Sequence, residues 1–126
     1  MIVLDNSILV DSLTGPRKSY PALRRVAASF DPLIVPTLVL YEWLRGPRLP
    51  FELDDLTAIM RPESIIPFGP QEARLAAELY LSVRRPRSRA FDLAIAACAI
   101  LRGASLWTLH PKDFQDIPNL RLHRLA

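Results

Sequence analysis

Four acidic residues that follow predicted strands or lie in the first turns of predicted helices are the residues best suited to carry chemistry in this sequence. They are Asp5, Glu42, Asp92 and Asp113. Carboxylates that converge on one site repel one another and take up protons unless a cation balances their charge. Ligand sets made only of oxygen suit hard cations such as Mg²⁺ or Mn²⁺, which can activate water and stabilise the charge on a phosphodiester under attack. The four acids therefore predict a metal-dependent nuclease, provided that the fold brings them together.

Each acid also has a plainer structural role open to it. Asp5 could cap the helix that follows it, and Glu42 could form an ion pair on a wet helix face. Asp113 could be a surface turn residue. Asp92 is different, because it is the only polar residue in the segment 90–101. A carboxylate in so apolar a segment is costly unless a cation or hydrogen bonds offset it, so a functional role is the better explanation there.

The cations of the chain are concentrated beyond residue 83. The formal net charge is +3, and residues 84–126 carry eight basic residues against three acidic ones. Fourteen of the sixteen cations are Arg, whose planar guanidinium matches phosphate better than the point charge of Lys. Four of them crowd into six positions: Arg84, Arg85, Arg87 and Arg89. This cluster is either a solvated surface loop or an edge that binds the phosphate backbone of RNA.

The elements that must position these residues alternate between short apolar strands and longer amphipathic helices. Strands are predicted at 2–4, 32–35, 64–66, 106–108 and 120–122, and helices at 7–13, 19–29, 37–46, 53–60, 70–83 and 88–103. Thr37 and Ser88 are expected to cap two of these helices. The alternation is typical of α/β proteins, so we expect a three-layer α/β/α sandwich with a mostly parallel sheet of four or five strands. Residues 1–126 are expected to form a single domain, with its site beyond the carboxyl ends of the strands.

The cysteine and histidine content excludes two other classes of site and indicates the cellular compartment. A single cysteine, Cys98, and only two histidines exclude an internal disulfide and a Cys/His zinc site. Such cysteine usage is typical of a reducing compartment, so we expect a cytoplasmic protein. The apolar segment 90–101 is too short to span a bilayer, and no export signal precedes the first acid, so no membrane association is expected.

Four short motifs carry a resemblance to a known family. They are Val3-Leu4-Asp5-Asn6-Ser7, Tyr41-Glu42-Trp43-Leu44-Arg45-Gly46, Asp92-Leu93-Ala94-Ile95-Ala96-Ala97 and Thr108-Leu109-His110-Pro111-Lys112-Asp113-Phe114. No motif is specific alone, but their order and spacing cover nearly all of the chain. Together they resemble the PIN-domain family, and within it the small VapC-like toxins of bacterial and archaeal toxin–antitoxin pairs.

The resemblance implies a function, a cofactor and partners. It makes the four acids the ligands of Mg²⁺ or Mn²⁺ in an endoribonuclease. We expect Asp5 and Asp92 to be direct or near-direct ligands, and Glu42 and Asp113 to bind through water or to position the attacking water. Ser7 matches the hydroxyl residue that supports the first acid, and Thr108 is expected to support it too. His110 stands where the family often has Asn, which changes the local hydrogen bonding. A toxin of this kind acts on RNA, forms a homodimer and is inhibited by a cognate antitoxin protein.

Other functions are open or excluded on specific residues. A receiver domain needs an aspartate after the strand 64–66, and a haloacid-dehalogenase-type phosphatase needs Asp-x-Asp where this chain has Asp5-Asn6-Ser7. The alternative that stays open is a catalytically silent PIN-like module that binds RNA or a protein. Large apolar residues on helices 37–46 and 70–83 are expected to be partly exposed, and they could form a self-complementary patch in a dimer.

Overall fold

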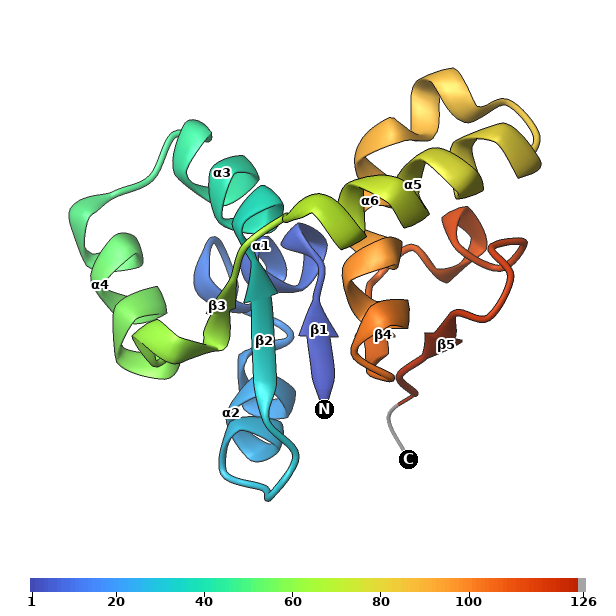
Figure 1. Cartoon of the computed structure of the whole chain (residues 1–126). Helices are drawn as coiled ribbons and strands as arrows, with labels where there is room; N and C mark the ends of the chain where they lie inside the picture. Colours follow the sequence, from blue (N-terminus) through green and yellow to red (C-terminus); the bar gives the residue numbers. More distant parts are fainter. Residues whose placement is uncertain (125–126) are drawn as a thin grey trace.

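Five short strands form one parallel sheet in the computed structural model, which describes residues 1–124. The strands are β1 (Ile2–Leu4), β2 (Leu33–Pro36), β3 (Ile65–Ile66), β4 (Ser105–Trp107) and β5 (Arg121–Leu122). Their order is β3-β2-β1-β4-β5, and every neighbouring pair is parallel. The expected parallel sheet of four or five strands is therefore confirmed, with β1 at its centre (Figure 1).

Helices connect the strands and cover the sheet on both sides, which completes the α/β/α sandwich (Figure 1). They are α1 (Asn6–Leu13), α2 (Tyr20–Ala27), α3 (Thr37–Arg45), α4 (Pro50–Ile59), α5 (Pro70–Ser82) and α6 (Ala90–Leu101), with 3₁₀ turns η1 (Pro62–Ser64), η2 (Pro86–Arg89) and η3 (Pro111–Asp113). Parallel strands need crossover connections of this kind. Among residues 1–124, no helix has both the length and the apolar character to cross a membrane.

The core lies where the central strands meet α1 and α6. Every residue of β1 and β2 is buried, as expected for parallel strands that are covered on both faces. The small side chains Ala96, Ala97 and Ala99 of α6 are also fully buried. Cys98, between them, is a buried free thiol. Asp92, in the first turn of α6, is therefore attached to one of the most deeply embedded helices in the protein.

The start of α4 and two expected helix caps differ from the sequence-based prediction. Helix α4 begins at Pro50 rather than residue 53, because Glu52 accepts a hydrogen bond of 2.7 Å from the backbone N–H of Leu49 and so caps the helix. The expected cap at Thr37 is wrong: Thr37 is the first residue of α3. Its hydroxyl instead accepts a 3.3 Å hydrogen bond from the N–H of Phe68, beyond β3. The cap at Ser88 is also wrong, because Ser88 lies inside η2.

The register of the sheet brings the carboxyl ends of β1 and β4 together. Leu4 pairs with Trp107, so the next residues, Asp5 and Thr108, leave the sheet side by side. The backbone N–H of Asp5 donates a 3.0 Å hydrogen bond to the carbonyl of Trp107. The strand order changes direction between β1 and β4, because the chain first builds β2 and β3 on one side of β1 and then β4 and β5 on the other. Such a switch point is where open parallel sheets bind ligands.

Candidate active site

The carboxylate of Asp5 is held in place by its own helix and by the neighbouring strand. Asp5 is the N-cap residue of α1, and its Oδ1 accepts a 2.8 Å hydrogen bond from the backbone N–H of Asn6. Its Oδ2 accepts hydrogen bonds from the hydroxyls of Ser7, at 2.9 Å, and Thr108, at 2.8 Å. Asp5 therefore does cap helix α1, but capping occupies only one lone pair of Oδ1.

The two hydroxyl groups are themselves oriented by the backbone. Ser7 Oγ accepts a hydrogen bond of 3.0 Å from the N–H of Leu109, and Thr108 Oγ1 accepts one of 3.0 Å from the N–H of His110. Both hydroxyl protons are then available to Asp5, which leaves none for the 3.3 Å contact between the two hydroxyls. A carboxylate oxygen has two lone pairs, so Oδ2 is saturated and Oδ1 keeps one for a further partner.

The other three acids lie close enough to interact with Asp5 or with one another. Burial, followed by the charges of Asp5 and Asp113, raises the pKa of Asp92 to about 6. Burial also raises the pKa of Glu42, and the charges of Asp5 and Asp92 add to the rise, while Arg45 opposes it. The charges of Asp5 and Asp92 therefore act on Glu42, and those of Asp5 and Asp113 act on Asp92. These four acids come from the N-cap of α1, α3, α6 and η3.

The ion pair with Arg45 provides a partner for only one of the two carboxylate oxygens of Glu42. Its Oε2 lies 3.9 Å from Arg45 Nη2, a long contact to a side chain that is 54% exposed. Its Oε1 is buried and has no hydrogen-bond partner. Buried acceptors are rarely left without a partner in native proteins. Glu42 therefore needs a further donor or a cation.

The four carboxylates fit a hydrated divalent cation. The raised pKa values of Glu42 and Asp92 and the unpartnered oxygen of Glu42 indicate a site that lacks positive charge. Within residues 1–124, no three Asp, Glu, His or Cys side chains are close enough together to coordinate one metal ion directly. Mg²⁺ does not need such a cage, because it usually keeps several waters and takes only one or two carboxylates directly. The oxygen-only set therefore fits Mg²⁺ or Mn²⁺.

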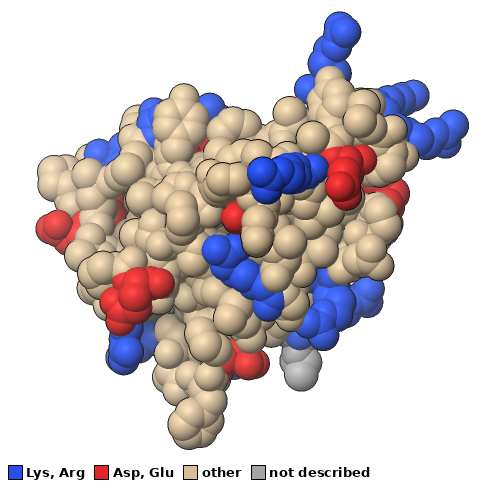
Figure 2. Space-filling view, viewed as in Figure 1, with Lys and Arg blue, Asp and Glu red and all other residues tan. Residues whose placement is uncertain are grey.

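A basic cleft adjoins the acids. It has a volume of about 650 Å³ and is lined by Arg84, Arg85, Ser88, Arg89, Asp92, Lys112, Asp113 and Asp116. Two of the four acids thus share one open cleft with three members of the arginine cluster. Basic side chains project from the end of the molecule that carries α5 and α6 (Figure 2). This combination can hold a polyanion next to the carboxylates.

Comparison with known proteins decides the family. The PIN-domain model matches residues 2–120. The chain belongs to the PIN-domain family. Comparison with curated proteins finds no match.

Several solved structures contain chains with the same fold. VapBC2 from Rickettsia felis, bound to a DNA fragment from its promoter, is 24% identical with a TM-score of 0.77, and all of both chains is covered. A toxin–antitoxin complex from Klebsiella pneumoniae is 24% identical with a TM-score of 0.73, covering 95% of each chain. FitAcB from Neisseria gonorrhoeae is 16% identical with a TM-score of 0.74, covering 98% of this chain and 97% of that one. The expected PIN-like fold is confirmed.

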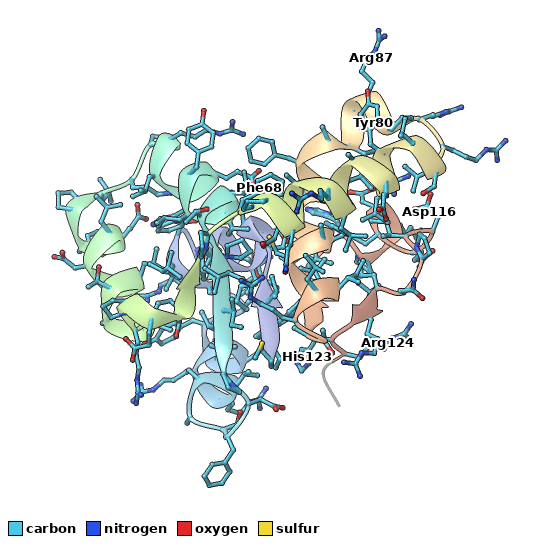
Figure 3. The ribbon with its side chains drawn as sticks, viewed as in Figure 1. Phe68, Tyr80, Arg87, Asp116, His123 and Arg124 are labelled. Atoms are coloured by element: carbon cyan, nitrogen blue, oxygen red, sulfur yellow. The ribbon has the colours of Figure 1, made fainter. Side chains whose placement is uncertain are left out.

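The arginine cluster of this PIN domain divides by position. Arg84 and Arg85 are exposed and line the cleft. Arg87 is exposed too, but it does not line the cleft and projects from the loop between α5 and α6 (Figure 3). Arg89 departs from the expectation of an RNA-binding side chain, because its guanidinium is already occupied within the protein.

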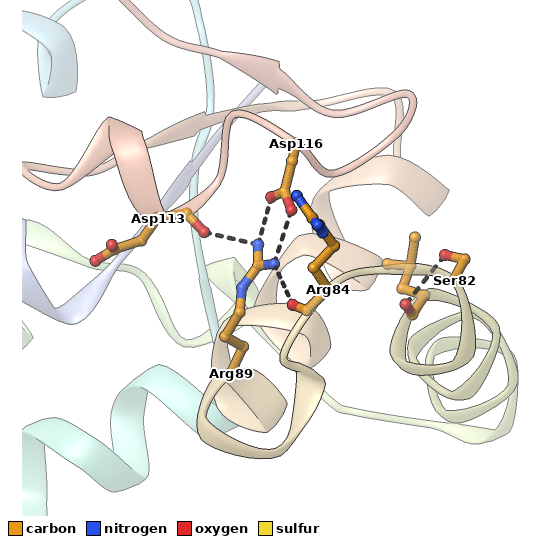
Figure 4. A network of polar contacts seen from close by, with 6 residues as sticks. Ser82, Arg84, Arg89, Asp113 and Asp116 are labelled. Carbon is orange, nitrogen blue, oxygen red and sulfur yellow. Dashed lines mark hydrogen bonds and ion pairs between the residues drawn. The ribbon is translucent and has the colours of Figure 1, made fainter.

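Arg89 joins three segments of the PIN domain (Figure 4). Its two terminal nitrogens bind the carboxylate of Asp116 at 2.8 and 2.5 Å. The same nitrogens donate to the backbone carbonyls of Arg84, at 3.1 Å, and Asp113, at 3.0 Å. A guanidinium has five N–H donors, so these bonds use four of them. Arg89 therefore fixes the loop that carries Asp113 against the start of α6.

Two residues of the cleft were missed by the sequence analysis. Asp116 was overlooked because only the folded chain shows that it pairs with Arg89. Lys112, which also lines the cleft, was given no role of its own in the sequence analysis. Its place inside the recognised motif was the signal that could have identified it.

Proposed function

We propose that this PIN domain is a metal-dependent endoribonuclease, which hydrolyses RNA phosphodiester bonds with Mg²⁺ or Mn²⁺, and that it is the toxin of a toxin–antitoxin pair. One observation carries the proposal: four carboxylates from separate elements share one electrostatic site, beside a cleft that is lined by arginines. Family membership supports it, since the same four acids stand in the motifs that resemble the VapC-like toxins.

The four acids would divide the work of holding the cation. Asp5 and Asp92 would be the direct ligands, and Glu42 and Asp113 would act through water. The bound ion would lower the pKa of a water molecule and stabilise the charge that develops on the phosphodiester. Asp5 is prepared for its role, because Ser7 and Thr108 fix its carboxylate and leave one lone pair on Oδ1.

The basic residues of the cleft would hold the RNA backbone. Arg84, Arg85 and Lys112 are exposed and lie on the same cleft as Asp92 and Asp113. Arginine suits phosphate because of its planar, bidentate geometry. Contacts to phosphate carry little sequence information, so they would position many RNAs equally well. The compartment that we propose is the cytoplasm, where such substrates are found.

A homodimer and an antitoxin are the proposed partners. Large apolar side chains are exposed on α3 and α5, among them Leu44 at 55%, Tyr80 at 36% and Leu81 at 85%. An exposed apolar group of this kind is typical of an interaction surface. The solved complexes with the same fold are toxin–antitoxin complexes, which supports an antitoxin partner. An inhibitory segment would present Arg or Lys to the four carboxylates, since a cation can replace the charge of the metal.

A digest of RNA by the pure protein tests the proposal. Wild-type protein should cut with Mg²⁺ or Mn²⁺ and stop cutting in EDTA, and Asp5→Asn should be inactive while it remains folded by circular dichroism. Asp54→Asn is the matched control, because Asp54 is an exposed acid on α4. Cleavage that survives in Asp5→Asn would refute the assignment of the site.

The toxin role needs a separate test in cells. Induced expression of the wild-type protein should arrest growth of a suitable bacterial host, and Asp5→Asn should relieve the arrest at an equal level of expression. Equal toxicity from both proteins would place the harm outside this site.

A catalytically silent PIN-like module is the second candidate. The observation that favours it is the absence, among residues 1–124, of three side chains already spaced for direct metal binding. Such a module would bind RNA or a protein but leave RNA intact under every metal condition of the digest.

A further inference from the structure

Two aromatic side chains lie next to the candidate active site and bridge two of its elements. Tyr41 directly precedes Glu42 on α3, and Phe91 directly precedes Asp92 on α6. Their ring centroids are 6.1 Å apart, with an angle of 31° between the ring planes. The pair therefore links the two helices at the positions beside two of the acids.

An arginine lies over both rings and also contacts Glu42. The guanidinium carbon of Arg45 is 5.2 Å from the centre of the Tyr41 ring and 5.7 Å from that of Phe91. The same guanidinium lies 3.9 Å from a carboxylate oxygen of Glu42. We call Tyr41, Arg45 and Phe91 together the aromatic surface.

Packing of the core does not account for the aromatic surface. Tyr41 is 54% exposed, and Phe91 is only partly buried. Neither ring belongs to the buried core or to the partly buried side chains packed against it. Arg45 is itself 54% exposed, and its long contact to Glu42 would be displaced at little cost. The surface is therefore open to a ligand.

We infer that the aromatic surface binds one unpaired base of a single-stranded RNA, beside the phosphodiester that the acids act on. The inference rests on the proposed function for the identity of the ligand. Every base has a π-face that can stack on Tyr or Phe, whereas the faces of bases within a duplex are covered by their neighbours. Arg45 supplies a cation that can contact the phosphate of the stacked nucleotide.

The basic cleft and the aromatic surface then recognise different parts of the RNA, the phosphates and one base. Asp92 lines the basic cleft and follows Phe91 directly in the chain. Arg45 contacts both rings and Glu42, so a strand whose phosphates lie in the cleft beside Asp92 would have a base near the aromatic surface. The cleft supplies affinity that depends on salt, and the aromatic surface selects single strands over duplexes.

Binding of a fluorescently labelled single-stranded oligonucleotide in EDTA tests the inference without cleavage. Tyr41→Ala and Phe91→Ala should each weaken binding about 5- to 150-fold, and Tyr41→Phe should keep wild-type affinity because it keeps a ring. Phe30→Ala is the matched control, since Phe30 is fully exposed in the loop before β2, at the opposite end of the sheet from Asp5. A duplex of the same sequence should bind more weakly to wild-type protein and be insensitive to these changes.

Two further measurements separate stacking from charge. The loss of affinity in Tyr41→Ala should be equal at low and high salt, whereas Arg45→Gln should lower the slope of affinity against salt by about one phosphate contact or slightly less. An exposed tryptophan in Tyr41→Trp should be quenched when the oligonucleotide binds, and its signal is distinct because Trp43 and Trp107 are both buried.

An oligonucleotide that lacks one base identifies the contact directly. Scanning an abasic site along the strand should reveal one position where wild-type protein loses affinity and the double variant Tyr41→Ala, Phe91→Ala loses no more. If the single Ala variants bind like wild type, or if no abasic position matters, the inference is wrong. If these variants instead convert a dimer to a monomer with unchanged affinity for RNA, the surface is an interface between copies of the chain, and the inference is again wrong.

The outcome is independent of the outcome for the proposed function. If stacking is measured but RNA stays intact with Mg²⁺ and Mn²⁺, the nuclease proposal fails and the inference stands. If the wild-type protein cuts RNA and the Ala variants cut it with the same kcat/KM, the inference fails and the nuclease proposal stands.

Discussion

Thr108 donates a hydrogen bond of 2.8 Å to Oδ2 of Asp5, although 103 residues separate the two in the chain. The parallel pairing of β1 with β4 makes the contact possible, because it places both residues at the same edge of the sheet. The backbone N–H of His110 donates a hydrogen bond to the Thr108 hydroxyl and so orients it toward the carboxylate of Asp5. The position of Asp5 therefore depends on β4, a strand that follows all six helices in the chain.

Thr108→Val should reduce activity while the fold is kept. The change removes one donor to Asp5 and leaves the N–H of His110 without its acceptor. Loss of such a supporting contact typically costs 10- to 100-fold in metal affinity or activity, and we expect kcat/KM to fall by about that factor. Thr108→Ser keeps the hydroxyl and should retain most of the activity. A Val variant with wild-type kcat/KM over a titration of Mg²⁺ would contradict this role.

Asp92→Asn should abolish cleavage and stabilise the metal-free protein at pH 7. Burial and neighbouring carboxylates raise the pKa of Asp92 from 3.8 to about 6, so its charged form is disfavoured in the folded state. The folded protein holds this proton more tightly than the unfolded chain, so its stability falls as pH rises through this range. The gain from Asn should be on the order of 1 kcal/mol, after allowance for partial exposure to solvent.

The pH dependence of that gain is the measurement. The difference in free energy of unfolding between Asp92→Asn and wild type should be largest above pH 6 and should disappear as pH falls below about 4. Urea titrations at several pH values, in EDTA, give this difference directly. Asp54→Asn should show no such pH dependence. If the difference for Asp92→Asn does not change with pH, the charged form of Asp92 is not disfavoured in the folded protein.

Loss of Arg89 should lower the stability of the fold, whereas loss of Arg84 should weaken RNA binding. Arg89→Met breaks the paired contact to Asp116 and two bonds to backbone carbonyls, so it should destabilise the fold by about 1–2 kcal/mol. Arg84→Gln should leave stability unchanged and weaken RNA binding, with a smaller dependence on salt. The double variant Arg89→Met, Asp116→Asn should lose less than the sum of its two single changes. Strict additivity in thermal unfolding would mean that the pair does not contribute as a unit.

Leu81→Glu should weaken self-association. Leu81 is 85% exposed on α5, near Tyr80, and a charge buried at an apolar interface is costly. We expect light scattering at micromolar concentration to give a dimer mass for the wild type and a monomer mass for the variant. Arg74→Glu on the same helix is the control, because Arg74 is exposed and already charged. A monomeric wild type would remove the dimer from the proposal.

Local patterns in the sequence were sufficient for the outline of the fold. Parallel strands buried on both faces are short apolar runs, and helices between them repeat their apolar residues with a different period, so both are visible before folding. The four acids were visible for a related reason, since each follows a predicted strand or lies in the first turns of a predicted helix. The helix start at Pro50 was misplaced because the contact of Glu52 with Leu49 decides it. The start at Ala90 was misplaced because residues Pro86–Arg89 form the separate 3₁₀ turn η2.

Contacts between distant segments were decided only by the tertiary structure. The sequence places Arg89 in a run of similar cations, and only packing shows that Asp116 occupies it while Arg84 and Arg85 stay free for the cleft. The pairing of Tyr41 with Phe91 likewise depends on how α3 crosses α6. Residue type and spacing determine which groups can ionise, cap or pack, because these properties are local. The partner that each group meets depends on strand register and helix packing, which involve the whole chain.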